Sequence, residues 1–452
     1  MMIGMGIGLT GLGSSYNPAS LFTVSGSRGF MYDLSDYSSQ FQDTAGTTPI
    51  TATSQSVARV NDKSGLGNHA TQATPANAPV SCILPSVGVR NRANGSAAPS
   101  GASWQSTSTV NGVTVTRVAS GFDTDGLPFV DYSVSGTASS EATSATYFSS
   151  DSRVAATTGQ AYTASFIAQV IAGTPPPATG GGNGVRADVV GETAPATFVE
   201  ATTSSVVGPT SATVITATHT LGNAASNQAR GLISIITRAG VTVSYTVRIK
   251  AVQFELGSSR TNYQFNYSQY NVTEAPFASV RGIQFDGVDD WLQTAAIDFS
   301  NSDEVTVVAG VRKLSDAARG VVVELGSPAA NYFGIQAPSA AAGNNYLAVS
   351  QGTLPASASG AATAPDTSIV SAQSKISTDS VILRRNGTQV ATSAADQGTG
   401  NFSNAVVYIG RRGGTSLPFN GVITFLFAIN RLLTASELAA VERFANSRTG
   451  AF

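Results

Sequence analysis

The amino-acid sequence predicts an all-β protein, and three observations support this prediction. Charged residues make up 12% of the 452 residues, about half the ~25% of an average soluble domain, so the Glu and Lys that favour helices are scarce. Glycine occurs 46 times, which suits many turns. Several segments alternate apolar and polar residues with the period of a strand. The hydrophobic fraction of 42% is high enough to fill cores and excludes a disordered chain.

The first block, residues 1–83, is expected to form short strands and ordered loops. Turn-forming residues interrupt each apolar run, and Gly65 and Gly67 offer positions for positive φ. The block is too small and too rich in loops to hold a core alone, so we expect it to pack on another part of the chain. Its glycine-rich start, Met1–Ser15, lacks the basic region of a secretory signal and is expected to be a docking arm or a disordered tail.

The second block, residues 84–275, is expected to form one β-sandwich. Alternating segments occur at 112–118, 162–170 and 232–236. The longest, Val241–Leu256, combines period-2 alternation with β-branched and aromatic residues, which is the strongest strand signal in the chain. Strands separated by turns over this length are typical of a sandwich.

The third block, residues 276–452, is expected to form a second sandwich that ends in a helix. Strands are expected at 283–292, 305–311, 320–325, 381–386, 406–410 and 421–429. Thr434 and Glu437 have the spacing of a capping box and predict a helix from there to about Ser447. Its predicted apolar face consists of Leu438, Val441, Phe444 and Ala445, with Gly450 beyond its end.

Composition excludes several classes of function. The net charge of -2 gives no basic surface for nucleic acid. The single Cys82 excludes an intrachain disulfide and a thiolate zinc site, and the two histidines, His69 and His219, are too few for a common metal site. The longest apolar stretch, Val422–Ile429, is far shorter than the ~18 residues that predict a membrane span, so no membrane insertion is expected. No nucleophile elbow, phosphate-binding loop or dinucleotide fingerprint is present, and we predict that the protein is not an enzyme.

Two groups of carboxylates remain as candidates for chemistry. They are Asp286, Asp289 and Asp290, and Asp123, Asp125 and Asp131. Glycoside hydrolysis needs only two carboxylates, and oxygen ligands suit Ca²⁺, but no Glu stands at the twelfth position of an EF-hand-like loop. Turn formation is the favoured interpretation of both groups, so no cofactor is predicted. A structural Ca²⁺ is conceivable, but no specific motif supports one.

Aromatic and basic residues are the candidates for sugar binding. Trp291 and Tyr263 could stack on a sugar, although each could instead belong to a core or pack between two sandwiches. Arg411 and Arg412 precede two glycines and could recognise an anionic group or form a solvated hairpin. Together with Asp289 and Asp290, these residues form the predicted carbohydrate-binding set, and no catalytic or metal-binding residue is predicted.

The first block resembles a module common in structural proteins of tailed phages and prophages. The resemblance rests on Tyr32–Asp36, Phe41–Pro49 and Asp62–Ala70, which occur in the expected order. Leu34 replaces the usual proline of the first motif, a change that affects turn rigidity more than identity. This resemblance implies a docking module for a virion over residues 1–83.

The other two blocks resemble lectin-like sandwiches. The closing strand Val247–Ser258 and the following Thr261–Tyr263 are similar to the end of jelly-roll carbohydrate-binding modules. Phe285–Leu292, Val407–Gly410 and Leu433–Leu438 are similar to concanavalin A-like, laminin G-type sandwiches. The resemblances imply a jelly roll over 84–275 and a concanavalin A-like sandwich over 276–452, although neither fold by itself proves sugar binding.

Together the resemblances imply a structural protein of the virion, assembled in the bacterial cytoplasm. A tail fibre or tail-tip component that contacts host surface glycan is the leading hypothesis, with weak contacts multiplied by copy number. By analogy the partners are the chain itself, as a trimer, and other virion proteins. A capsid decoration protein or head fibre, and a glycan-degrading enzyme, are the alternatives.

Overall fold

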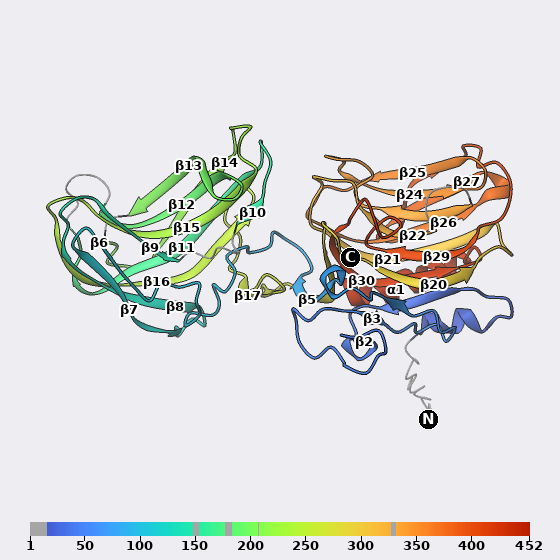
Figure 1. Ribbon diagram of the computed structural model, residues 1–452, viewed down its shortest axis with the longest axis horizontal. Helices are drawn as coiled ribbons and strands as arrows, with labels where there is room; N and C mark the ends of the chain where they lie inside the picture. Colours follow the sequence, from blue (N-terminus) through green and yellow to red (C-terminus); the bar gives the residue numbers. More distant parts are fainter. Residues whose placement is uncertain (1–15, 148–152, 177–182, 207, 327–330) are drawn as a thin grey trace, which may run out of the picture. The chain divides into compact units, whose positions relative to one another are not determined.

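A computed structural model describes residues 16–147, 153–176, 183–206, 208–326 and 331–452. The expected arm at Met1–Ser15 lies outside the described residues. Among the described residues, strands dominate, α1 (Ala435–Thr449) is the one α-helix, and it is too short and too polar to cross a membrane. The all-β prediction is therefore confirmed (Figure 1).

The chain forms two compact units whose boundaries differ from the three expected blocks. Unit 1 contains residues 1–50, 57–79 and 285–452, and unit 2 contains 51–56 and 80–284. Most of the N-terminal block thus groups with the C-terminal sandwich rather than with the jelly roll that directly follows it. The expected boundaries at 83/84 and 275/276 lie four and nine residues from the observed 79/80 and 284/285.

Unit 1 is built from two sheets. Within this unit the first sheet contains, in hydrogen-bonded order, β30 (Asn420–Ile429), β21 (Glu304–Lys313), β26 (Asp366–Lys375), β27 (Ser380–Arg385) and β28 (Thr388–Ser393), with β1 (Gly29–Asp33) also paired to β30. The second contains β2 (Gln40–Phe41), β3 (Arg59–Val60), β4 (Ala70–Thr71), β20 (Leu292–Asp298), β29 (Asn404–Ile409), β22 (Val321–Leu325), β23 (Tyr332–Gln336), β24 (Asn345–Gln351) and β25 (Pro355–Ala361). Strands of the N-terminal block therefore extend both sheets.

Helix α1 packs on the first sheet of unit 1. Thr434 accepts a hydrogen bond from the Glu437 backbone N–H, and the Glu437 carboxylate accepts one from the Thr434 N–H, which completes the predicted capping box. Leu438, Val441 and Ala445 are buried against β21, β26 and β30, as the predicted apolar face requires. Gly450 ends the helix in the left-handed conformation that favours glycine.

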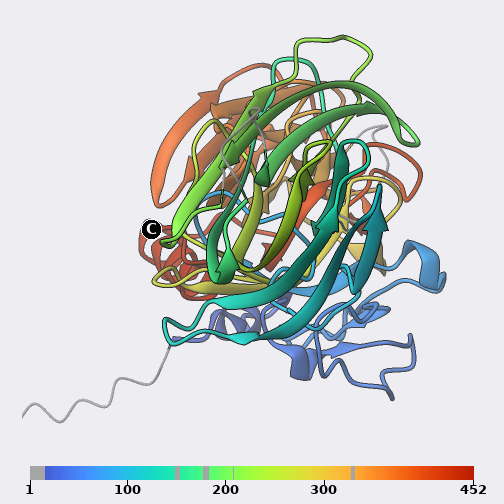
Figure 2. The same ribbon diagram turned by 90° about the vertical axis from the view of Figure 1, so that its left-hand side faces the viewer.

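Unit 2 contains a sandwich of two antiparallel sheets (Figure 1 and Figure 2). One sheet has the order β14 (Thr213–Thr220), β11 (Ala161–Thr174), β16 (Thr242–Leu256), β8 (Pro128–Thr137), β7 (Val113–Phe122) and β6 (Thr107–Val110). The other has the order β10 (Val154–Ala155), β15 (Gln228–Thr237), β12 (Gly184–Thr193) and β13 (Thr197–Val206), with β9 (Ala142–Tyr147) also paired to β15. Alternate residues of both sheets fill one core, which includes Trp104 at 2% exposure.

Shorter strands complete unit 2 outside the sandwich. They are β5 (Val80–Pro85), β17 (Phe265–Ser268), β18 (Asn271–Thr273) and β19 (Ser279–Asp286), whose last two residues belong to unit 1. Strand β5 pairs with both β18 and β19. The chain enters and leaves the sandwich next to these strands, because Asn91 near its start hydrogen-bonds to Gln264 near its end.

Candidate functional site

Five of the six residues of the predicted carbohydrate-binding set lie together in unit 1. Asp289, Asp290 and Trp291 lie on the turn that joins β19 to β20, and Arg411 and Arg412 lie on the loop that follows β29. Strands β20 and β29 pair with each other, so this register places the two segments side by side. Tyr263 belongs to unit 2 and is not part of this group.

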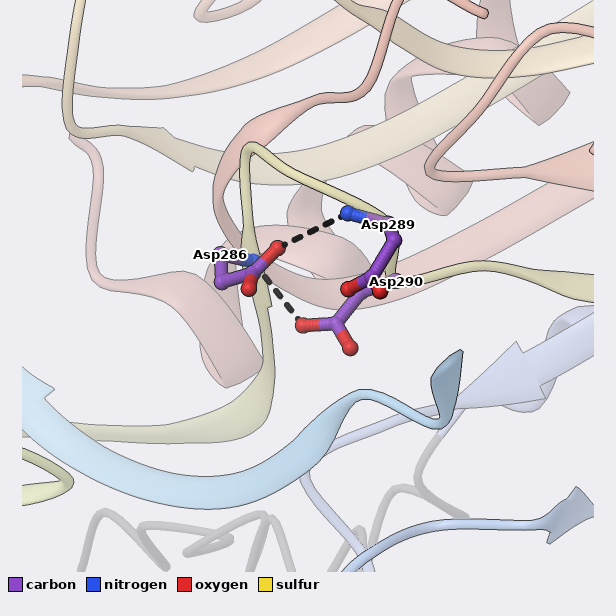
Figure 3. A group of neighbouring side chains, drawn as sticks. All are labelled: Asp286, Asp289 and Asp290. Carbon is purple, nitrogen blue, oxygen red and sulfur yellow. Dashed lines mark hydrogen bonds between the residues drawn. The ribbon is translucent and has the colours of Figure 1, made fainter. Parts of the chain in front are cut away.

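The aspartates build a tight turn (Figure 3). The Asp286 carboxylate accepts a hydrogen bond from the Asp289 N–H at 3.3 Å. It also accepts one from the Val288 N–H at 2.7 Å. The Asp290 Oδ2 accepts one from the Asp286 N–H at 2.9 Å. Gly287 has a φ of 80°, which an L side chain rarely adopts. The carboxylates of Asp286 and Asp290 therefore stabilise a turn, as the favoured interpretation of this group predicted.

The carboxyl of Asp290 sits in an unusual environment. Asp290 is only 7% exposed. Desolvation, with smaller contributions from the nearby Asp286 and Asp289, raises the pKa of Asp290 to about 7. Asp290 is therefore largely protonated below neutral pH, while the unfolded chain would ionise it near pH 4.

The three aspartates are also the group of described residues whose side chains could hold a cation together. Their ligand oxygens all lie within 4.8 Å of one another. Ca²⁺ takes six to eight oxygens, however, and one oxygen of Asp290 and one of Asp286 already accept backbone hydrogen bonds. We assign no cation to this turn.

The second carboxylate group, in unit 2, is paired with basic side chains. Arg248 donates to both oxygens of Asp131, at 2.8 and 2.9 Å, and Lys250 lies within 3.1 Å of Asp123 and 2.6 Å of Asp125. Asp123 and Asp125 also bond the backbone of the turn between β7 and β8. These carboxylates thus serve a turn and an ion-pair cluster.

The arginines hold the second loop of the site. Arg411 donates to the carbonyl oxygens of Asp289, at 3.3 Å, and Thr415, at 3.1 Å, so it ties this loop to the aspartate turn. Arg412 donates to Glu324 at 3.0 Å, and the Gly413 N–H donates to the same carboxylate at 3.1 Å.

Glu324 was not among the predicted site residues. It lies on β22 and is 1% exposed, and burial raises its pKa. The sequence did offer a signal for Glu324, because it is the single carboxylate inside the apolar run 321–325. A charge in a buried strand needs a partner, so this position could have been predicted to pair with a basic residue. Its partners, Arg412 and the Gly413 N–H, lie almost 90 residues away in sequence.

Trp291 is partly exposed and rigidly held. Its backbone N–H donates to Asn77 at 3.0 Å, and its carbonyl accepts from Gln72 at 3.2 Å, so the N-terminal block positions it. The ring centroid lies 6.0 Å from that of Tyr408. Gly414 lies so close to the ring that an added Cβ would stand 2.9 Å from it. Gly414 thus covers the benzo edge of the indole, and Nε1 at the pyrrole edge is buried, so only part of the ring is exposed.

Tyr263 has a structural environment instead. It is 9% exposed, its ring lies edge-on to Phe265 at 5.1 Å, and its hydroxyl hydrogen-bonds to Ser96. Tyr263 thus packs within unit 2, whereas Tyr267 of the same aromatic segment is exposed. A buried ring has no free face for a sugar.

The two histidines serve in separate polar networks. His69 accepts a hydrogen bond from the Asp62 N–H. His219 contacts Glu200 at 3.2 Å and Thr202 at 2.9 Å. Glu200 also accepts from Gly222, Asn223 and Ser226, so the network closes a sandwich edge.

Comparisons with known proteins find limited likeness. No protein-family model and no curated protein matches the chain. Among solved structures, the CBM40 of the Ruminococcus gnavus IT-sialidase matches at 19% identity and a TM-score of 0.27, over 32% of this chain and 84% of that one. The same module bound to alpha2,3 sialyllactose matches at 20% identity and a TM-score of 0.26, over 31% and 83%. The botulinum neurotoxin serotype G binding domain matches at 10% identity and a TM-score of 0.30, over 36% and 43%. The likenesses are partial, and the function proposed below is based on the chain's own residues.

Proposed function

We propose that the protein is a non-enzymatic structural component of a phage virion, part of a tail fibre or tail tip, that contacts host surface glycan through unit 1. The sequence motifs of the three blocks support the virion assignment. The observation that carries the glycan contact is the convergence of Asp289, Trp291 and Arg411 on two adjoining loops.

The chemistry of these loops suits a sugar. Sugars offer hydroxyl groups that accept from a guanidinium and donate to a carboxylate, and C–H faces that pack on an aromatic ring. Asp286, Asp289 and Trp291 are at least partly exposed, and Arg411 is too. Hydrogen bonds to Asn77, Gln72 and Glu324 fix the backbone around them, so little order would have to be gained on binding.

Replacement of the indole tests the glycan contact. We expect Trp291→Ala to weaken binding of the full-length chain to extracted host surface glycan by at least tenfold, measured by biolayer interferometry. Trp104→Phe is the control, because Trp104 is buried in the other unit. Equal binding by wild type and Trp291→Ala, with both folded, would exclude this site.

The location in the virion is tested separately. Immunogold labelling of purified particles with antibody against residues 276–452 should place gold at the tail. Gold on the head would favour the alternative of a decoration protein or head fibre. Particles without label, from a lysate that contains the protein, would contradict the virion assignment. The proposed trimer is tested by light scattering of the purified chain.

One observation favours glycan degradation as a second candidate function. Asp290, with a pKa raised to about 7, stands beside Asp286 and Asp289, and glycosidases use a pair of carboxyl groups of which one has a raised pKa. Replacing Asp289 and Asp290 together by Asn decides between glycan degradation and glycan binding without catalysis. Unchanged release of reducing sugar from host polysaccharide would remove these residues as catalysts, and its abolition would establish an enzyme.

A further inference from the structure

The outward face of one sheet of unit 2 carries a cluster of charged residues with no role in the site above. On β12, Val185, Ala187 and Val189 point into the core, so Arg186, Asp188 and Glu192 point to the opposite face. On β15, Ala229, Ile233 and Ile235 point into the core, so Arg230 and Ser234 lie on that same opposite face. Arg153, just before β10, reaches this face as well.

The two acids of this cluster are buried and each contacts arginine. The Glu192 side chain has no exposed surface, and its two oxygens lie 2.7 Å from the Nε atoms of Arg153 and Arg230. The Asp188 side chain is 4% exposed and lies 2.7 Å from the Nε of Arg186. With three arginines and two carboxylates, the cluster has a formal charge of +1.

The strand register arranges the arginines around Asp188. Arg230 is opposite Val190, and Arg186 is opposite Ser234, so the two arginines are four residues apart along the strands, or roughly 13 Å at ~3.3 Å per residue. Asp188 lies between them, and the charge of each arginine lowers its pKa against the larger effect of desolvation, which raises it. Leu232, opposite Asp188 and partly exposed, adds an apolar contact surface.

Much of the hydrogen-bonding capacity of this cluster is unused. In the part of the chain that the structure describes, Arg153, Arg186 and Arg230 donate no hydrogen bond from an Nη atom. The Nε atoms of Arg186 and Arg230 are already engaged within the cluster, because each lies 2.7 Å from an oxygen of Asp188 or Glu192. The Nη groups of these arginines are therefore the donors that a ligand could use.

Arg248, on the other sheet of the same unit, shows the contrasting case. It donates from both Nε and Nη2 to Asp131, and its guanidinium lies 3.8 Å from the centre of the Phe129 ring. Its polar and planar surfaces are thus used within the protein. Arg248 is 25% exposed and the three arginines of the cluster are 23% to 26% exposed, so the two cases differ in hydrogen bonding and not in exposure.

We propose that Arg153, Arg186 and Arg230 form a binding site for a sugar that carries a carboxylate, such as a uronic acid. The planar guanidinium donates two parallel hydrogen bonds to a carboxylate, and the formal charge of +1 matches one such group. The mixture of donors and acceptors suits a ligand that also carries hydroxyl groups. This inference goes beyond the proposed function, because it concerns the other unit and a charged ligand.

Calorimetric titration of the full-length chain with galacturonic acid trisaccharide tests the proposal. Arg186→Gln and Arg230→Gln should each weaken binding by at least tenfold. Arg238→Gln should leave the affinity unchanged, because Arg238 lies just beyond β15 and pairs with Glu141, away from the cluster.

Further arms identify the chemistry and protect the test against misfolding. Maltotriose, a neutral trisaccharide, should compete far more weakly, and so should inorganic phosphate. Arg230→Lys keeps the charge next to Glu192 but loses the planar fork, so it should weaken binding while the melting temperature stays near that of wild type. Unchanged affinity in folded Arg186→Gln and Arg230→Lys, or equal competition by maltotriose or by phosphate, would overturn the proposal.

Discussion

At the scale of single residues, Asp290 combines a turn-forming hydrogen bond with a costly charge. The hydrogen bond to the Asp286 N–H needs an acceptor oxygen, which Asn also provides. The charge is unfavourable because the carboxyl is buried beside two other acids. Asp290 is thus a residue at which one polar function can be removed while the other is retained.

We predict that Asp290→Asn stabilises the protein at pH 8 but not at pH 4. The folded pKa of about 7 exceeds the ordinary 3.8, so the folded state binds more protons than the unfolded state between these values. Asp290 therefore favours folding at low pH, and this contribution is lost as the pH rises toward 7. The rise in pKa from 3.8 to about 7 corresponds to about 4 kcal/mol at most.

Chemical denaturation at the two pH values measures this difference. The fall in unfolding free energy between pH 4 and pH 8 should be smaller for Asp290→Asn than for wild type. Asp289→Asn is the matched control, because it removes a neighbouring carboxylate that is more exposed. The same pH dependence in wild type and Asp290→Asn would show that the pKa of Asp290 in the folded protein is the ordinary pKa of an aspartate.

At the scale of elements, the sequence predicted the ends of α1 and the strand β16, which depend on residues close together in the chain. The capping box of Thr434 and Glu437 and the glycine at 450 fixed both ends of α1 within two residues of the prediction, since caps are contacts between neighbours in sequence. The alternation of 241–256 likewise predicted β16. It did not predict that Ala251 would adopt a positive φ of 54°, where the pairing with β11 shifts register.

The helix cap gives a prediction at this scale. Thr434→Ala removes the acceptor for the Glu437 N–H and should cost about 1 kcal/mol of unfolding free energy. Urea denaturation followed by tryptophan fluorescence measures it. Ser436→Ala removes a hydroxyl two residues away that caps no backbone N–H, and it should cost clearly less. An equal cost for both variants would mean that the capping bond contributes nothing specific.

Long-range partners were beyond the reach of the sequence. All five residues of β1 are buried, so the strand has no polar face to indicate which side meets the core. Its partner, β30, lies almost 400 residues later. The pairing of Glu324 with Arg412 has the same character. Five of six predicted site residues lie together nonetheless, because the turn at 286–291 precedes β20, the loop at 411–416 follows β29, and these two strands are antiparallel neighbours.

At the scale of the whole molecule, the N-terminal block is part of the C-terminal sandwich. Strand β1 adds to one sheet of unit 1, β2, β3 and β4 extend the other, and Gln72 and Asn77 hold the backbone of Trp291. A module that resembles a docking element is thus folded into the unit that carries the candidate site. Residues at the two ends of the chain should therefore depend on each other for stability.

Phe30→Ala tests this dependence through a distant reporter. Phe30 has no exposed surface, lies on β1 opposite Ala428, and stacks on Tyr32 with ring centroids 4.9 Å apart. Its truncation should cost about 3–5 kcal/mol. In a Trp104→Phe background, Trp291 is the single tryptophan, so its fluorescence reports on unit 1. The urea midpoint should fall markedly although the substitution is some 260 residues away in sequence.

Phe166→Ala is the matched control, since Phe166 is equally buried but lies in the core of unit 2. In the same background, Phe166→Ala should leave the urea midpoint of the Trp291 fluorescence nearly unchanged. It should lower the stability of unit 2, which the loss of near-ultraviolet circular dichroism measures. The contrast depends on where each phenylalanine packs, because the residue type and the burial are the same. A Trp291 midpoint that moves equally in both variants would mean that the two units unfold as one. A midpoint that Phe30→Ala leaves unmoved would mean that β1 contributes little to the sandwich on which it packs.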